Sequence, residues 1–142
     1  MAIKQLSIFV DNKPGKLIDI VKSISDAGIN IRAMSIADTQ DFGILRLIVS
    51  DNERLMKILG EKSIVKTTEV LAVKMEDKAG ALYNVVKVLS DAGINIEYVY
   101  AFTAHSELGE YVVFRVDDVR SAEKELNDKG FVTLNSEDMA QM

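Results

Sequence analysis

The chain has 142 residues, with 17 lysines and arginines against 22 aspartates and glutamates, so its formal net charge is −5. This balance argues against a nucleic-acid-binding protein, whose affinity depends on clustered positive charge, and against electrostatic attachment to anionic membranes. Cysteine is absent and His105 is the single histidine, which excludes disulfides, metal sites built on cysteine and thiol catalysis.

The first predicted strand contains Leu6, Ile8 and Val10, whose alternation with polar residues is typical of a strand with one buried face. The stretch 11–15 then predicts a turn that opens a helix, because its proline suits a first helical turn. Apolar residues at positions 17, 20, 21 and 24 have helical spacing and predict an amphipathic helix. Gly28 is expected to end this helix in a left-handed conformation.

Two further strands are predicted over 29–36 and 42–49, joined by a turn at 38–41. A second helix is expected over 52–59, with Asp51 as its N-cap. A short strand over 64–67 follows. The predicted order is therefore strand, helix, strand, strand, helix, strand.

The rest of the chain repeats this order. The sequence Ser-Asp-Ala-Gly-Ile-Asn-Ile at 25–31 recurs unchanged at 90–96, an offset of 65. Residues 11–31 and 76–96 are identical at 12 of 21 aligned positions, whereas chance would give about one identical position. The best offset later becomes 67, which places an insertion in the turn at 103–109. These observations predict two domains, 1–69 and 70–142.

The second copy follows the first element by element. A strand is expected at 71–75, a helix with apolar positions at 82, 85, 86 and 89, and Gly93 as its left-handed end. Asp118 is the expected N-cap of the last long helix. The remaining expectations are strands at 94–102, 111–116 and 131–134, a helix at 119–128 ending near Gly130, and a frayed polar tail at 136–142.

This order predicts an α+β protein of two ferredoxin-like βαββαβ domains. In each domain an antiparallel sheet carries both helices on one face. The two sheets are expected to lie side by side as one eight-stranded sheet. A homodimer is expected to cover the apolar surface that remains, because two-fold assemblies are common and a copy of about 70 residues has a marginal core.

Residues 10–17, Val-Asp-Asn-Lys-Pro-Gly-Lys-Leu, and residues 25–31 together resemble the ACT domain. Hallmarks of that family are a D/N-x-P-G-x-L turn opening the first helix and a G-I/V-N-I start to the second strand. Both copies carry the second hallmark, but Ala79 replaces the proline in the second copy. The resemblance covers residues 3–135 and implies a stand-alone pair of ACT domains that binds a free amino acid and regulates amino-acid metabolism.

The resemblance also implies two ligand sites, each combining the turn before the first helix with the start of the second strand. Free N–H groups at a helix start attract a carboxylate, and an asparagine amide both donates and accepts hydrogen bonds. Asp77 could pair with an α-ammonium group, where Asn12 could only hydrogen-bond, so the two sites are expected to differ. The implied contacts are Asn12, Pro14, Gly15, Lys16, Leu17 and Asn30 in the first copy, and Asp77, Ala79, Gly80, Ala81, Leu82 and Asn95 in the second.

The same residues have structural explanations. Asn30 and Asn95 follow a helix-ending glycine, where asparagine satisfies backbone groups. Pro14 and Gly15 could serve only to start the helix, without contacting a ligand. Asp11 is expected to be an N-cap, and for Asp77 the cap and the ligand contact are both open.

Two features of the second copy have no counterpart in the first. Tyr98, Tyr100 and Phe102 alternate, so they share one strand face. Core or interface packing is the favoured role, and lining of a ligand pocket is the alternative. His105 lies in the inserted turn without ligand partners, so no metal role is expected.

The leading prediction is a non-catalytic, amino-acid-binding regulatory protein in the cytoplasm, without cofactor, metal, nucleic-acid or membrane partner. The alternative is a regulatory subunit that acts by contact on an amino-acid biosynthetic enzyme such as acetolactate synthase. An enzyme or carrier of the same architecture is disfavoured. The turns lack the arginine of an acylphosphatase-like site, residues 43–47 lack the aromatic and basic pattern of an RNA-binding sheet, and no cysteine is present to carry a heavy metal.

Overall fold

The computed structural model describes residues 2–38, 41–60, 63–102 and 110–140. The chain divides into two compact units. We call Gln5–Thr68 the first unit, and Met1–Lys4 with Glu69–Met142 the second unit. Each unit holds one copy of the repeat, except that the residues before Gln5 belong to the second unit.

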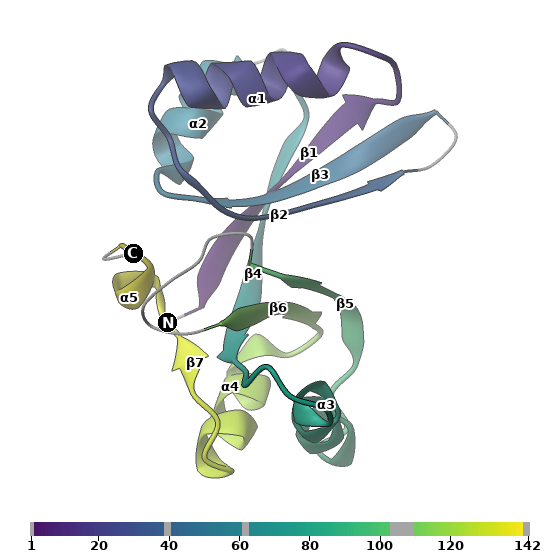
Figure 1. Cartoon of the computed structure of the whole chain (residues 1–142), viewed down its shortest axis with the longest axis vertical. Coiled ribbons are helices and arrows are strands. Elements are labelled where there is room, and N and C mark those ends of the chain that lie inside the picture. Colours follow the sequence, from purple (N-terminus) through teal and green to yellow (C-terminus); the bar gives the residue numbers. More distant parts are fainter. Residues whose placement is uncertain (1, 39–40, 61–62, 103–109, 141–142) are drawn as a thin grey trace. The chain divides into compact units, whose positions relative to one another are not determined.

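The elements follow the predicted order in both copies (Figure 1). Strands β1 and β4 are each divided between the two units. The first unit contains α1, β2, β3 and α2, and the second contains α3, β5, β6, α4, β7 and α5. Their bounds are β1 Ile3–Asp11, α1 Lys16–Asp26, β2 Ile31–Asp38, β3 Phe42–Val49, α2 Asn52–Leu59, β4 Val65–Lys74, α3 Ala81–Asp91, β5 Ile96–Ala101, β6 Tyr111–Val116, α4 Val119–Asp128, β7 Thr133–Leu134 and α5 Ser136–Ala140.

The sheet topology is the same in each unit. The hydrogen-bonded strand order is β4-β1-β3-β2 in the first unit and β7-β4-β6-β5 in the second. The strand pairs β1–β3, β2–β3, β4–β6, β4–β7 and β5–β6 are antiparallel. Within each unit both long helices lie on one face of the strands (Figure 1). The predicted α+β ferredoxin-like fold class is therefore confirmed.

The predicted number of eight strands is wrong for the described residues, which form seven. The short strand expected at 64–67 and the strand expected at 71–75 are one continuous strand, β4. No proline or glycine lies between them, and Val65–Lys74 contains three valines and two threonines, residues that favour extended backbone.

Each unit buries its own core between sheet and helices. In the first unit the strand residues Leu6, Ile8 and Leu45 pack with Ile24 of α1 and Leu55 of α2. In the second, Leu71, Val73 and Phe114 pack with Leu89 of α3 and Leu126 of α4. The apolar periodicity therefore identified most core positions. Leu82 is an exception, because it lies in the first turn of α3 and is 48% exposed.

The predicted helix boundaries are largely confirmed. The backbone N–H groups of Arg54 and Ser121 donate to the side chains of the N-caps Asp51 and Asp118, at 3.0 and 3.1 Å. Gly28 and Gly93 have positive φ angles of 69° and 73°, which allow the chain to turn out of the helix.

We expect alanine at Asp51 to lower the free energy of unfolding by about 1 kcal/mol, because the Arg54 N–H loses its acceptor. Urea denaturation measures this loss. Serine at the same position is the control, since its hydroxyl can also cap the helix. Equal stability of the alanine and serine variants would contradict this role.

Asp118 gives a pH-dependent contribution. The Ser121 backbone N–H and hydroxyl donate to its carboxylate, and they lower its pKa below the ordinary 3.8. Such a group stabilises the folded chain above its unfolded pKa and loses this contribution as pH falls through the folded pKa. The difference in melting temperature between wild type and Asp118→Asn is therefore expected to be constant near neutrality and to shrink below about pH 3.8. A constant difference through the acid range would contradict this.

Three local expectations are wrong. Pro14 lies before α1 and not in its first turn, because the left-handed Gly15, at φ 87°, separates it from the helix. Asp11 is not an N-cap for the same reason, since Gly15 holds that position without a side-chain hydrogen bond. The tail forms the short helix α5, in which the Asp138 N–H donates to Asn135 at 2.7 Å. The inserted turn at 103–109, with His105, lies outside the described residues.

Candidate functional site

The turn between β1 and α1 leaves backbone donors at the start of a helix. Gly15 is left-handed at φ 87°, and the helix begins at Lys16. The Lys16 N–H donates to Lys13 O at 3.3 Å. Within the described chain, the N–H groups of Leu17 and Ile18 donate to no protein acceptor outside the helix. These groups can therefore receive an anion, and the positive end of the helix dipole favours one there.

The second unit repeats this geometry without the proline. Gly80 has φ 89°, and α3 begins at Ala81, whose N–H donates to Lys78 O at 3.3 Å. The turn is therefore set by the glycine, not by the proline. Lys78 also forms an ion pair with Glu76 at 2.7 Å. This pair raises the pKa of Lys78 and lowers that of Glu76, in each case chiefly through the hydrogen bond between them. Asp77 is not an N-cap, because Gly80 holds that position.

Asn30 and Asn95 lie at the other end of the first helix of each copy. The Asn30 N–H donates to the Ser50 hydroxyl at 3.0 Å, and the Ser50 N–H donates to Asn30 O at 2.9 Å. Asn95 forms the same pair of bonds with Asp117, at 3.1 and 3.2 Å. The main chains of both asparagines thus hold the start of a strand against the end of its neighbour. Both residues remain exposed to solvent.

Within one unit the expected contacts therefore do not meet. Helix α1 has 11 residues, so its two ends lie about 16 Å apart. A single free amino acid cannot reach both the turn at Gly15 and Asn30 of the same unit. The turn residues 12–17 lie together, as do residues 77–82, and each asparagine stands apart from the turn of its own copy.

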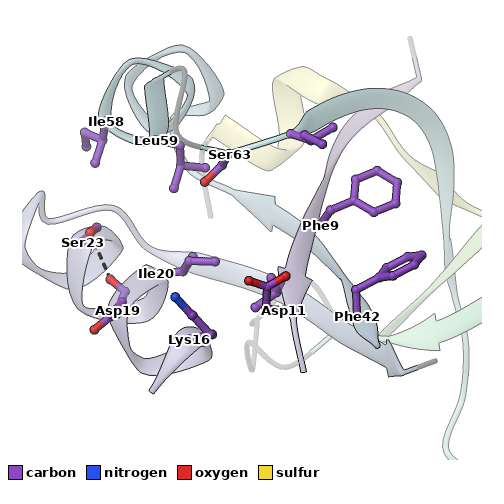
Figure 2. A pocket seen from close by; sticks show the side chains of 12 residues that line it. Phe9, Asp11, Lys16, Asp19, Ile20, Ser23, Phe42, Ile58, Leu59 and Ser63 are labelled. Carbon is purple, nitrogen blue, oxygen red and sulfur yellow. Dashed lines mark hydrogen bonds between the residues drawn. The ribbon is translucent and has the colours of Figure 1, made fainter. Parts of the chain in front are cut away.

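A pocket of about 570 Å³ opens beside the turn of the first unit (Figure 2). The Phe9 N–H donates to Ile64 O at 3.1 Å, which holds the chain entering β4 along β1 as one wall. Figure 2 places Phe9 and Phe42 on one side of the β1 ribbon and the helix residues on the other. The lining residues are Phe9, Val10, Asp11, Lys16, Asp19, Ile20, Ser23, Phe42, Ile58, Leu59, Ser63 and Ile64.

The second unit has a smaller pocket, of about 310 Å³, at the corresponding place. The Lys74 N–H donates to Val132 O at 2.8 Å, so the last strand again forms a wall. The lining residues are Lys74, Met75, Glu76, Lys78, Ala81, Asn84, Val85, Gly130, Phe131 and Val132. Six of them stand 65 positions after residues that line the first pocket.

Of the contacts expected from the sequence, one lines each pocket, Lys16 in the first and Ala81 in the second. The remaining lining residues come from the end of the first strand, the inner face of the helix and the segment entering the last strand. The lining residues of the first strand and the helix recur at an offset of 65 in the sequence, and this repeat could have identified them. The lining residues next to the last strand reach the pocket only because that segment pairs with the first strand.

The aromatic residues of β5 lie elsewhere. Tyr98 and Tyr100 pair with Arg115 and Val113 of β6, on the sheet face opposite the core. The rings of Tyr98 and Tyr100 stack with centroids 6.3 Å apart, and Phe102 contacts Tyr111 at 5.8 Å. The expectation that the three share one face is therefore confirmed, and they do not line the pocket of the second unit.

Two wider features bear on function class. None of the helices in the described residues is long and apolar enough to cross a membrane. Histidine, aspartate and glutamate side chains form no cluster of three that could hold a metal ion within the described ranges.

Known proteins support the assignment of family. The profile of the family described as ACT domain pair matches residues 1–142. The crystal structure of protein BT0572 from Bacteroides thetaiotaomicron is similar with 34% identity and a TM-score of 0.89, over 100% of this chain and 98% of that one. A comparison with curated proteins gives no match.

More distant structures share the fold. The regulatory subunit of aspartate kinase from Thermus thermophilus has a TM-score of 0.65 at 12% identity, over 92% of this chain and 94% of that one. The Thermus flavus regulatory subunit has a TM-score of 0.60 at 12% identity, over 90% and 92%. The chain belongs to the ACT domain pair family, a family of regulatory domains, which confirms the resemblance found in the sequence.

Proposed function

We propose that the protein is a non-catalytic regulatory protein whose ACT domains, residues 1–69 and 70–142, sense a free amino acid. The observation that carries the proposal is the duplicated combination of a left-handed glycine, free helix-start amides and an adjoining pocket. A carboxylate fits such amides, and the pocket beside them offers room for a side chain. The expected ligand contacts are therefore the turn residues 12–17 and 77–82. Asn30 and Asn95 would contribute to a site only from another ACT domain.

Thermal unfolding tests this proposal directly. A ligand that binds only the folded state raises the melting temperature, and the rise grows with the ratio of ligand concentration to Kd. The full chain is melted with each of the standard amino acids at millimolar concentration, with the matching D-amino acid as control. A stereospecific rise with one or a few amino acids is expected. The absence of any rise would refute amino-acid sensing.

A homodimer is a further part of the proposal, supported by apolar side chains at equivalent helix positions. Ile18 of α1 and Tyr83 of α3 stand 65 residues apart in the repeat and are 67% and 66% exposed. Leu82 beside Tyr83 is also exposed. Exposed apolar side chains favour a protein contact, and a second copy would offer the same helices in return.

We expect the double variant Ile18→Ser, Tyr83→Ser to shift the dimer towards the 15.7 kDa monomer in light scattering. The melting temperature at low protein concentration should change little, because neither side chain is buried. The variant Lys57→Ser on α2 serves as a surface control. A wild-type chain that is monomeric at micromolar concentration would contradict the dimer, and leave regulation by contact with another enzyme as the alternative, to be sought by affinity capture from the native host.

A further inference from the structure

We propose that the pocket of the first unit binds an amino acid with a large apolar side chain, and that the pocket of the second unit does not bind it. This inference rests on the proposed function, because it names the ligand class of that site. It follows from the side chains that line the two pockets, and from the matching positions at which the two copies carry different residues.

The first pocket offers charges for both ends of a zwitterion. Lys16 extends from the first turn of α1, and Asp11 lies at the end of β1 (Figure 2). The ion pairs formed among the described residues include neither Lys16 nor Asp11. A ligand carboxylate can therefore pair with Lys16 and the neighbouring helix-start amides, and a ligand ammonium with Asp11.

Part of the remaining lining is apolar and offers a surface for a ligand side chain. Ile20 of α1 and Ile58 and Leu59 of α2 form it (Figure 2), with Val10 from β1, next to the polar Asp19, Ser23 and Ser63. Ile58 is exposed and would be covered by the ligand. An apolar side chain removes this surface from water, whereas a charged one would lose hydration where it lies against these apolar groups. Leucine, isoleucine, methionine and phenylalanine fit this description.

The second pocket lacks this arrangement at the matching positions. Ala81 replaces Lys16, so α3 provides no cation, and Asn84 replaces Asp19. Glu76, which replaces Asp11, is already paired with Lys78 at 2.7 Å. A cation, Lys74, stands where the first pocket has the apolar Phe9. The volume of about 310 Å³ is also at the lower end for ligand pockets.

Titration calorimetry on the full chain tests the proposal with leucine, methionine and phenylalanine against glycine, serine, lysine and glutamate. Binding of the apolar group is expected at one ligand per chain, at least tenfold tighter than the others. Leucinamide and N-acetyl-leucine, each lacking one charge, are expected to bind at least tenfold more weakly than leucine. These ligand variants leave the protein unchanged, so they test the two charged contacts without any risk to folding.

The variant Lys16→Met keeps the aliphatic stem and removes the charge, and we expect it to weaken leucine binding at least tenfold. The control variant Lys57→Met, at an exposed lysine of α2 that lines neither pocket, should leave binding unchanged. Thermal melts without ligand check that both variants fold.

The outcomes separate the two proposals. Preferential binding of lysine or glutamate, two equal sites per chain, or an equal loss in Lys57→Met would overturn this inference and leave amino-acid sensing intact. Binding of N-acetyl-leucine as tightly as leucine would also overturn it, and would point to the carboxyl end of a peptide. Failure of every amino acid to bind would overturn both.

Discussion

Replacement of Phe114 by alanine is expected to lower the free energy of unfolding by about 3–5 kcal/mol, the range for removing a buried aromatic side chain. Phe114 is fully buried in the middle of β6, opposite Leu71 of β4, and packs in the core of the second unit. Its removal loses the transfer free energy of the ring and leaves a cavity between the sheet and the helices α3 and α4. Urea denaturation measures the loss, provided that the m value, the dependence of the free energy of unfolding on urea concentration, is unchanged.

The repeat provides a matched position in the first unit and a surface control. Leu47, which stands 67 residues earlier, is also buried, and its change to alanine is expected to cost about 2–5 kcal/mol. Val132→Ala should change stability by no more than about 0.5 kcal/mol, since Val132 is 53% exposed. A cost of Phe114→Ala no larger than that of Val132→Ala would show that the core is assigned wrongly.

The second large effect is expected at the left-handed glycines that precede α1 and α3. Gly15 and Gly80 have φ angles of 87° and 89°, a region that side chains with Cβ branches avoid. No atom lies within 4 Å of a Cβ built on either residue, so a substitution meets strain in the backbone and not a steric clash. Valine at Gly80 is therefore expected to cost about 1–3 kcal/mol.

Asparagine at the same position separates backbone strain from the mere loss of glycine. Asparagine adopts left-handed conformations more readily than other residues with a side chain, so Gly80→Asn should be less destabilising than Gly80→Val. The same order is expected at Gly15. Urea denaturation of the four variants measures it, and equal losses for asparagine and valine would contradict a left-handed turn.

Much of the fold was predictable because the sequence patterns that specify its helices and strands are local and occur in both copies of the repeat. The bounds of β3, α2, β6 and α4 were predicted correctly, since apolar periodicity, the Asp51 and Asp118 caps and the glycine stops agree. The errors occur where tertiary structure overrides a local signal. Pro14 was expected in the first turn of a helix because proline is tolerated there, but Gly15 is left-handed and the helix begins only at Lys16.

The site was less predictable than the fold. Family resemblance led to the turn residues and to Asn30, which the structure separates by the length of α1 within a unit. The pocket depends on Ser63 and Ile64, which reach Phe9 only through strand pairing. No spacing along the chain indicates such a pairing. The exchange of Lys16 for Ala81 was visible in the repeat, but it acquires meaning only when both residues are placed at pocket walls.

The assignment of the residues before Gln5 to the second unit has a consequence for the order in which the chain can fold during synthesis. The first unit consists of the continuous stretch Gln5–Thr68, so it can fold once that stretch has left the ribosome. Ala2 packs against the core of the second unit, and Ile3 is buried. Both residues must wait for the second unit until about 70 residues beyond Thr68 have been synthesised. The segment before Gln5 therefore waits for its packing partners longer than the residues of the first unit do.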